Sequence, residues 1–123
     1  MKDIVVIGAG KIGASVAGLL AQTGDYQVTL VDRSPEILGH LDRNERIRIA
    51  AADVEDSSEL VNLLNGQFAV LSAAPFHLTT RIAEAARAAR THYLDLTEDV
   101  ASTRRVRELA ADASTAFCSA FTK

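Results

Sequence analysis

Three glycines near the amino terminus, Gly8, Gly10 and Gly13, have the spacing that brings a peptide backbone close to an anion. They follow the branched apolar run at residues 4–7 and precede a stretch in which apolar residues recur at helical spacing. At such a junction the first glycine permits a sharp turn, the second lets a phosphate approach, and the third lets a helix pack closely on a strand. Free N–H groups at the helix start, with the helix dipole behind them, favour negative charge. The chemistry expected here is the binding of a pyrophosphate.

An acidic residue, Asp32, stands nineteen residues after Gly13 and ends the second apolar run, at residues 28–31. At that distance from a glycine loop, a carboxylate accepts hydrogen bonds from the ribose hydroxyls of an adenosine. The loop and the acid together therefore predict a nicotinamide dinucleotide as the ligand. Asp32 favours NAD, because its charge would repel the 2′-phosphate of NADP. NADP remains possible, since Arg33 could pair with that phosphate instead of stacking over the adenine or facing solvent.

Residues beside the glycines and after the third expected strand complete the adenosine half of the site. Lys11 and Ile12 lie within the loop, where Lys11 would either approach the phosphates or carry surface charge. Asp53 and Val54 follow the apolar run at residues 47–50 and would border the adenine, because ligands bind at the carboxyl ends of parallel strands. Asp53 could equally cap a turn.

Small residues, Ala73, Ala74 and Pro75, follow the fourth expected strand. Alanine is a poor helix cap, so the helix expected from Pro75 begins with N–H groups that no side chain serves. Small side chains there also leave room for the ribose and the nicotinamide. After the fifth expected strand, Asp95 precedes the segment at residues 97–99, whose favoured role is to cap the next helix and complement its dipole.

Other residues capable of chemistry are scattered along the chain. Histidines stand at positions 40, 77 and 92, and Cys118 is the single cysteine, so the spacing of a metal site is missing. His77 falls near the expected cofactor edge, where an exposed helix position is the favoured interpretation. The chain has no serine nucleophile elbow, and Lys11 lacks the neighbours of a Walker lysine. We therefore assign neither a catalytic residue nor a metal ligand.

Alternating strand and helix patterns predict the fold that would position these residues. Strands are expected at residues 4–7, 28–31, 47–50, 68–71, 92–96 and 115–118, and helices at residues 11–22, from Ser34, from Asp56 to Asn65, from Pro75 and at residues 98–111. Such a series forms a parallel sheet with helices on both faces. The sequence therefore predicts a doubly wound α/β fold, the Rossmann fold, with six strands in the order 3-2-1-4-5-6.

Size and charge fit a single dinucleotide-binding domain over residues 1–123. Apolar residues make up 48% of the chain and the formal net charge is −3, which argues against a nucleic-acid partner. The apolar runs are far shorter than the roughly 20 residues that span a bilayer, so no membrane partner is expected. A lone cysteine cannot form an internal disulfide and no signal peptide is visible, so the expected location is cytoplasmic.

The segments VVIGAGKIG, LSAAPFHLTTRIAEAARAARTHYLDLTED and the strand between them resemble the N-terminal NAD(P)-binding domain of the saccharopine dehydrogenase-like family. The Ala-Ala-Pro and the HYLDLTED segment are more specific than the glycine loop, which very many dehydrogenases share. The resemblance implies an NAD(P)-dependent oxidoreductase that acts on carbon–nitrogen bonds of amino-acid substrates. By position it places Gly8, Gly10, Gly13 and Asp32 at the cofactor, and residues 73–75 at its nicotinamide half.

The resemblance also sets an expectation about catalysis. In the family, the strand matching residues 115–118 leads into a substrate domain, whereas this sequence stops at CSAFTK. The resemblance therefore implies that this domain binds the cofactor but does not catalyse a reaction by itself, because the substrate site requires an absent domain. An alternative is a regulatory nucleotide-sensing Rossmann module of a potassium-transport system, against which the Ala-Ala-Pro and HYLDLTED segments speak. No sequence feature indicates an oligomeric state.

Overall fold

A parallel sheet runs through the residues that the computed structural model describes, which are 2–8, 10–32, 47–96, 100–111 and 113–119. Within them its strands are β1 (Lys2–Ile7), β2 (Tyr26–Asp32), β3 (Ile47–Ala51), β4 (Ala69–Ser72), β5 (His92–Asp95) and β6 (Phe117–Ser119). Every neighbouring pair is parallel, in the order β3-β2-β1-β4-β5-β6. The predicted parallel α/β fold is confirmed. The sixth place in the order is taken by β6, a strand of three residues.

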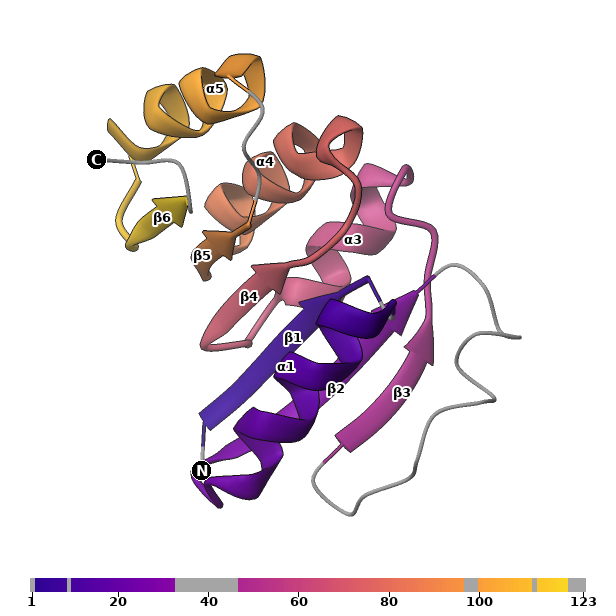
Figure 1. The fold of residues 1–123 in the computed structure, drawn as a ribbon. Coiled ribbons are helices and arrows are strands. Elements are labelled where there is room, and N and C mark those ends of the chain that lie inside the picture. Colours follow the sequence, from indigo (N-terminus) through magenta and orange to yellow (C-terminus); the bar gives the residue numbers. More distant parts are fainter. Residues whose placement is uncertain (1, 9, 33–46, 97–99, 112, 120–123) are drawn as a thin grey trace.

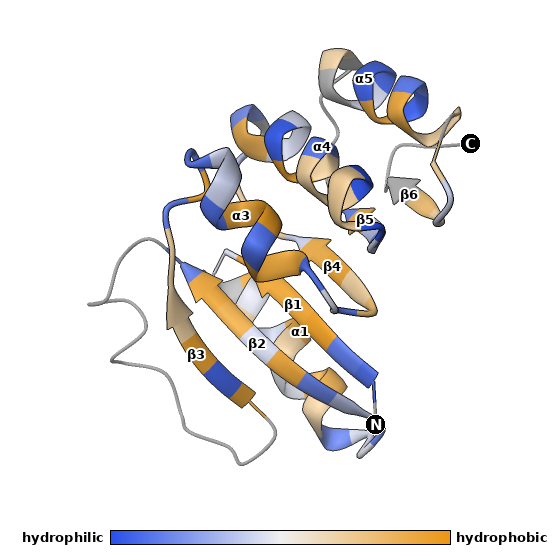
Figure 2. Ribbon diagram, turned by 180° about the vertical axis from the view of Figure 1, so that it is seen from behind, coloured by the Kyte–Doolittle hydropathy of each residue, from blue (hydrophilic) through white to orange (hydrophobic). Residues whose placement is uncertain are grey.

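Helices cover both faces of this sheet. Helix α1 (Lys11–Gln22) lies in front of β1 and β2 (Figure 1), and Figure 2 shows α3 (Ser57–Leu64), α4 (Thr79–Ala89) and α5 (Val100–Ala111) over the opposite face. The helix expected from Ser34 lies outside the described residues, as do residues 97–99, which were expected to open the last helix.

The central strand β1 is buried on both faces, as its continuous apolar run predicts. Side chains alternate between the two faces of a strand. Val5 and Ile7 belong to the core cluster that also contains Leu60 of α3 and Ile82 of α4. Ile4 and Val6 belong to the cluster on the other face, under α1. Burial of each such side chain stabilises the fold by about 1.5–3 kcal/mol, so β1 is anchored on both of its faces.

The start of α3 has the spacing of a capping box in the sequence, with Asp56 three residues before Glu59. Asp56 is the N-cap, and its Oδ1 accepts a hydrogen bond from the N–H of Glu59 at 3.1 Å. The reciprocal half of a capping box would return the Glu59 carboxylate to the N–H of Asp56. Instead Glu59 Oε1 accepts from the N–H of Asp53 at 3.4 Å, so this helix start extends its hydrogen bonding into the preceding loop.

The predicted start of the fourth helix at Pro75 is wrong by one turn. A short 3₁₀ segment, η1 (Phe76–Leu78), comes first, and α4 begins at Thr79 with Leu78 as its N-cap. The Leu78 N–H donates to the carbonyl of Pro75 at 3.0 Å. Where no side chain caps a helix, the tighter i→i+3 bond is a common way to satisfy its first turn. The consequence is an additional turn of chain next to the Ala-Ala-Pro segment.

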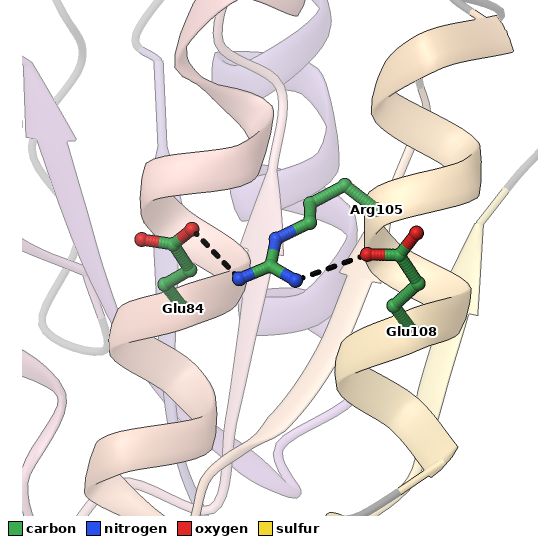
Figure 3. A network of polar contacts seen from close by, with 3 residues as sticks. All are labelled: Glu84, Arg105 and Glu108. Atoms are coloured by element: carbon green, nitrogen blue, oxygen red, sulfur yellow. Dashed lines mark hydrogen bonds and ion pairs between the residues drawn. The ribbon is translucent and has the colours of Figure 1, made fainter.

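Helices α4 and α5 are joined on their outer side by an exposed ion-pair network (Figure 3). The Arg105 guanidinium lies 3.0 Å from Glu108 on its own helix and 3.4 Å from Glu84 on α4. The hydrogen bond to Glu108 raises the pKa of Arg105, although that group is charged at any ordinary pH. All three side chains are exposed, so the network contributes little to stability.

Candidate functional site

Six of the residues singled out from the sequence line one cleft at the carboxyl ends of β1 to β4. The cleft measures about 310 Å³, and these six are Gly8, Asp32, Asp53, Val54, Ala74 and Pro75. They come from four segments that are far apart in the sequence, and each segment follows or ends a different strand. A parallel sheet gathers such segments at one edge, which is where ligands bind in open α/β folds.

The same cleft is lined by residues that the sequence reasoning missed or set aside. Glu55 follows the predicted Asp53 and Val54, and His77, interpreted earlier as an exposed helix residue, lies in η1. Ile7 and Leu78 add apolar surface. The strand-end rule could have found Glu55, since it continues the loop after β3. His77 was expected near the cofactor edge because it closely follows Pro75, and the structure places it exposed in η1, within the cleft lining.

Carboxylates dominate the charge of the cleft. Asp32, Asp53 and Glu55 all line it, and its lining within the described part of the chain contains no lysine or arginine. The Oδ1 of Asp53 accepts a hydrogen bond from the N–H of Glu55 at 2.9 Å. Of the two interpretations left open for Asp53, the turn cap is therefore present in the structure. Its position in the cleft lining is compatible with the other.

Gly8 occupies a position where any larger residue would be strained and would clash with the backbone. Its φ is +101°, and a Cβ there would lie 2.8 Å from the carbonyl oxygen of Ala73. Two backbone bonds fix this approach: the Gly8 N–H donates to Val31 and the Ala73 N–H donates to Ile7, each at 2.8 Å. The first glycine of the motif therefore turns the chain sharply and also lets the end of β1 touch the loop after β4.

Gly13 lets α1 pack directly on this turn. A Cβ on Gly13 would collide with the carbonyl group of Gly8, and it would lie 3.7 Å from the Cβ of Ala73. Gly13 is buried in the first turn of α1. We call the contact among Gly8, Gly13 and Ala73 the glycine junction. The close packing predicted for the third glycine is present, with the Gly8 backbone as its partner.

Gly10 differs from its two neighbours in the motif, because open space surrounds it. It is the N-cap of α1, its φ of −66° and ψ of −173° are extended, and a Cβ there would meet nothing within 4 Å. As a glycine, the N-cap residue has no side chain with which to cap the first N–H groups of the helix. Open space therefore lies at the positive end of the α1 dipole, an end that favours anions, and the approach of a pyrophosphate to Gly10 stays a prediction.

The remaining predicted positions lie apart from the cleft or outside the described residues. Ile12 is on the first turn of α1, 63% exposed, and is not among the residues that line the cleft. Lys11 begins α1, but its side chain lies outside the described part, as does all of Arg33. Their roles stay predictions.

The end of β5 turns its polar groups inward. Asp95 is 4% exposed, and its Oδ2 accepts a hydrogen bond from the hydroxyl of Tyr93 at 2.5 Å. Burial, together with this bond to the carboxylate, raises the pKa of Tyr93. The pair is therefore a buried polar contact at the end of β5, and neither residue is among those that line the cleft. Residues 97–99 lie outside the residues that the structure describes.

Among the residues that the structure describes, no three His, Cys, Asp or Glu side chains gather in a way that could hold a metal ion. None of the described helices has the length and apolar content needed to cross a membrane.

Comparison with known proteins gives one family match and several structural ones. Residues 4–118 match the family described as the saccharopine dehydrogenase NADP binding domain. A stretch of 50 residues is 44% identical to glycerol-3-phosphate dehydrogenase [NAD(P)+] from Agrobacterium fabrum. This stretch covers 41% of this chain and 15% of that protein. The chain thus spans a small part of this curated relative.

Among solved structures, saccharopine dehydrogenase (L-Glu forming) from Saccharomyces cerevisiae has a TM-score of 0.87 at 20% identity, covering 98% of this chain and 27% of that chain. A short-chain dehydrogenase/reductase from Veillonella parvula, in complex with NADP, has a TM-score of 0.67 at 17% identity, covering 96% of this chain and 67% of that one. At these identities the likeness concerns the fold.

Proposed function

The chain belongs to the saccharopine dehydrogenase NADP binding domain family, and from this premise we propose that it binds NAD in the cleft at the carboxyl ends of β1 to β4. The observation that carries the proposal is the start of α1, where open space at Gly10 meets helix N–H groups without a side-chain cap. A Cβ would fill that space, and an anion is what the helix end favours. Calorimetric titration of the chain with NAD tests the proposal, and absence of binding would reject it.

The cleft suggests how the dinucleotide would lie. The pyrophosphate would receive hydrogen bonds from the backbone between Gly10 and Gly13, and the adenosine ribose would donate to Asp32. The adenine would lie against Val54, beside Asp53. The nicotinamide half would extend toward residues 73–75, where alanine side chains leave room for a ring.

The role of this chain in a reaction would be to hold and orient the cofactor. When bound, the nicotinamide supplies a hydride donor or acceptor. The protein groups proposed here bind the diphosphate and ribose, while the wall formed by Ala74 and Pro75 limits where the ring can lie. Fixing the ring in this way contributes the entropic part of catalysis, provided that a substrate is held against it.

We expect the chain to bind NAD more tightly than NADP. Asp32, Asp53 and Glu55 give the cleft three carboxylates, and a 2′-phosphate would add a dianion beside them. A charge-assisted hydrogen bond from the ribose contributes about 1.5–3 kcal/mol, so the preference is expected to be roughly tenfold or more. Dissociation constants measured for both cofactors under one salt condition check this.

Asp32→Asn is the matched variant for that preference. It keeps the size of the side chain and removes the charge, so the two dissociation constants should move closer together. Equal constants in the unmodified chain, or tighter binding of NADP, would contradict the preference and assign the discriminating role to Arg33.

We further propose that the chain supplies only the cofactor side of an oxidoreductase that acts on carbon–nitrogen bonds. Hydride transfer also needs a proton donor or acceptor at the reacting nitrogen, and none is assigned here. The expected result is stoichiometric NAD binding with no NADH formed from saccharopine or lysine, followed by absorbance at the reduced nicotinamide band. Sustained NADH formation would contradict this and would require a catalytic group such as Lys11 or His77. The cytoplasmic location stays a prediction from the sequence.

A further inference from the structure

One long-range hydrogen bond joins two of the segments that line the cleft. Arg81, in the first turn of α4, donates from Nη1 to the backbone carbonyl of Glu55 at 3.1 Å. Glu55 lies in the loop between β3 and α3, twenty-six residues earlier in the chain. The cleft lining takes Asp53, Val54 and Glu55 from this loop, and it takes Pro75, His77 and Leu78 from the turn that leads into α4.

Within itself the loop is already well ordered. Asp53 accepts from the N–H of Glu55 through its carboxylate at 2.9 Å and from the N–H of Asp56 through its carbonyl at 3.1 Å. Glu59 accepts from the N–H of Asp53 at 3.4 Å. All of these bonds join residues 53–59 to one another. They fix the shape of the turn but not its distance from α4.

Contacts that leave the loop decide where it stands. Val54 is 7% exposed and belongs to the same core cluster as Ile82 of α4. Ala52 donates from its N–H to the carbonyl of Asp32 at 3.2 Å, which ties the beginning of the loop to β2. The Arg81 bond attaches the exposed side of the loop to α4 at Glu55, on the peptide next to the Asp56 cap.

We propose that Arg81 is a positioning residue for the adenosine end of the cleft, holding the loop at residues 53–55 at a fixed distance from the turn at residues 75–78. It touches no reacting group and acts through the Glu55 backbone. A site whose walls are held in place before the ligand arrives loses less conformational entropy on binding. This inference rests on the proposed dinucleotide function, since it names a residue that prepares the same cleft.

A positively charged residue near a cleft for an anionic ligand could also act by attraction alone. The two roles differ in their dependence on salt. Attraction between exposed charges is largely screened at high ionic strength, whereas a change in the position of a loop persists. Arg81→Met removes both the charge and the donor while keeping the apolar stem. Arg105→Met removes the same charge from an arginine that also bridges to a neighbouring element, away from the cleft.

The experiment titrates ADP-ribose into the full chain and both variants at about 0.05 M and about 0.5 M salt. Arg81→Met is expected to bind roughly 5–10-fold more weakly than the unmodified chain at both salt concentrations, because the loop at residues 53–55 must then be ordered on binding. Arg105→Met is expected to bind within twofold of it. Arg81→Lys, which keeps a cationic donor, is expected to recover part of the loss. A deficit that vanishes at high salt, or no deficit, would overturn the proposal.

Hydrogen exchange on the unliganded chain separates this inference from the proposed function. Arg81→Met should speed exchange of the Glu55 and Asp56 amides, while amides in β1 keep their protection. If the unmodified chain fails to bind ADP-ribose, the proposed function fails, and faster exchange at Glu55 still supports the role of Arg81 in holding the loop. Unchanged exchange at these amides would reject that role whether or not the ligand binds.

Discussion

Gly13→Ala is expected to destroy most of the stability of the chain, whereas Gly18→Ala on the same helix should raise it slightly. A Cβ on Gly13 would collide with the Gly8 carbonyl, which is backbone held by the end of β1. Moving α1 away would open the core beneath it, so we expect a loss of about 3 kcal/mol or more. A Cβ on Gly18 would meet nothing within 4 Å, and alanine is favoured over glycine in a helix by about 1 kcal/mol.

Urea unfolding followed by circular dichroism measures both variants. A loss of 3 kcal/mol is a large part of the roughly 5–15 kcal/mol that holds a domain together, so Gly13→Ala should unfold at a much lower urea concentration. Both changes are glycine to alanine within α1, and therefore their difference removes the effect of helix propensity. Equal midpoints for the two variants would mean that α1 does not pack on the Gly8 backbone.

Gly10→Val is expected to abolish dinucleotide binding and leave the stability nearly unchanged. The backbone of Gly10 is extended and its surroundings are open, so a valine fits without strain. Its branched side chain would then occupy the space proposed for the pyrophosphate. Two lost hydrogen bonds to a charged group amount to about 3–6 kcal/mol, which weakens NAD binding by at least about a hundredfold. Calorimetry with NAD and a parallel unfolding curve provide the two measurements.

Ser15→Val is the matched control for this variant. Ser15 is an exposed residue of α1, two residues after Gly13, so the same side chain is added outside the proposed site. Its affinity for NAD should equal that of the unmodified chain. If Gly10→Val also binds NAD with unchanged affinity, the pyrophosphate does not lie at the start of α1, and the proposed pose is wrong.

Local patterns were enough to predict much of the frame of the site. The apolar run of β1 and the Asp56 cap of α3 each depend on a few adjacent residues, and both are present as predicted. The glycine spacing likewise predicted separate tasks for Gly8 and Gly13, because the constraints that they relieve are steric and come from the strand–turn–helix path itself.

Features that depend on contacts between distant segments could not be predicted from the sequence. Nothing near Pro75 indicates that a 3₁₀ turn will delay α4, since the choice between i→i+3 and i→i+4 bonding is settled by packing. The bond from Arg81 joins a side chain to the backbone carbonyl of Glu55. Every residue has such a carbonyl, so the residue type at position 55 does not indicate the bond. Glu55 and His77 differ from these features, because each follows a strand end closely enough for the strand-end rule to place it near the cleft.

The glycine junction also bears on how such a chain diverges over evolutionary time. At Gly8 and Gly13 a larger residue meets backbone, so selection for a folded chain removes most substitutions there whatever the ligand is. Asp53 and Glu55 reach the cleft from exposed positions, and replacing them costs little folding energy. A lineage can therefore change its cofactor, or give up nucleotides altogether, without losing its glycine signature. In such descendants the glycine motif would be kept because the fold requires it. The residues at positions 53 and 55 would differ according to the ligand.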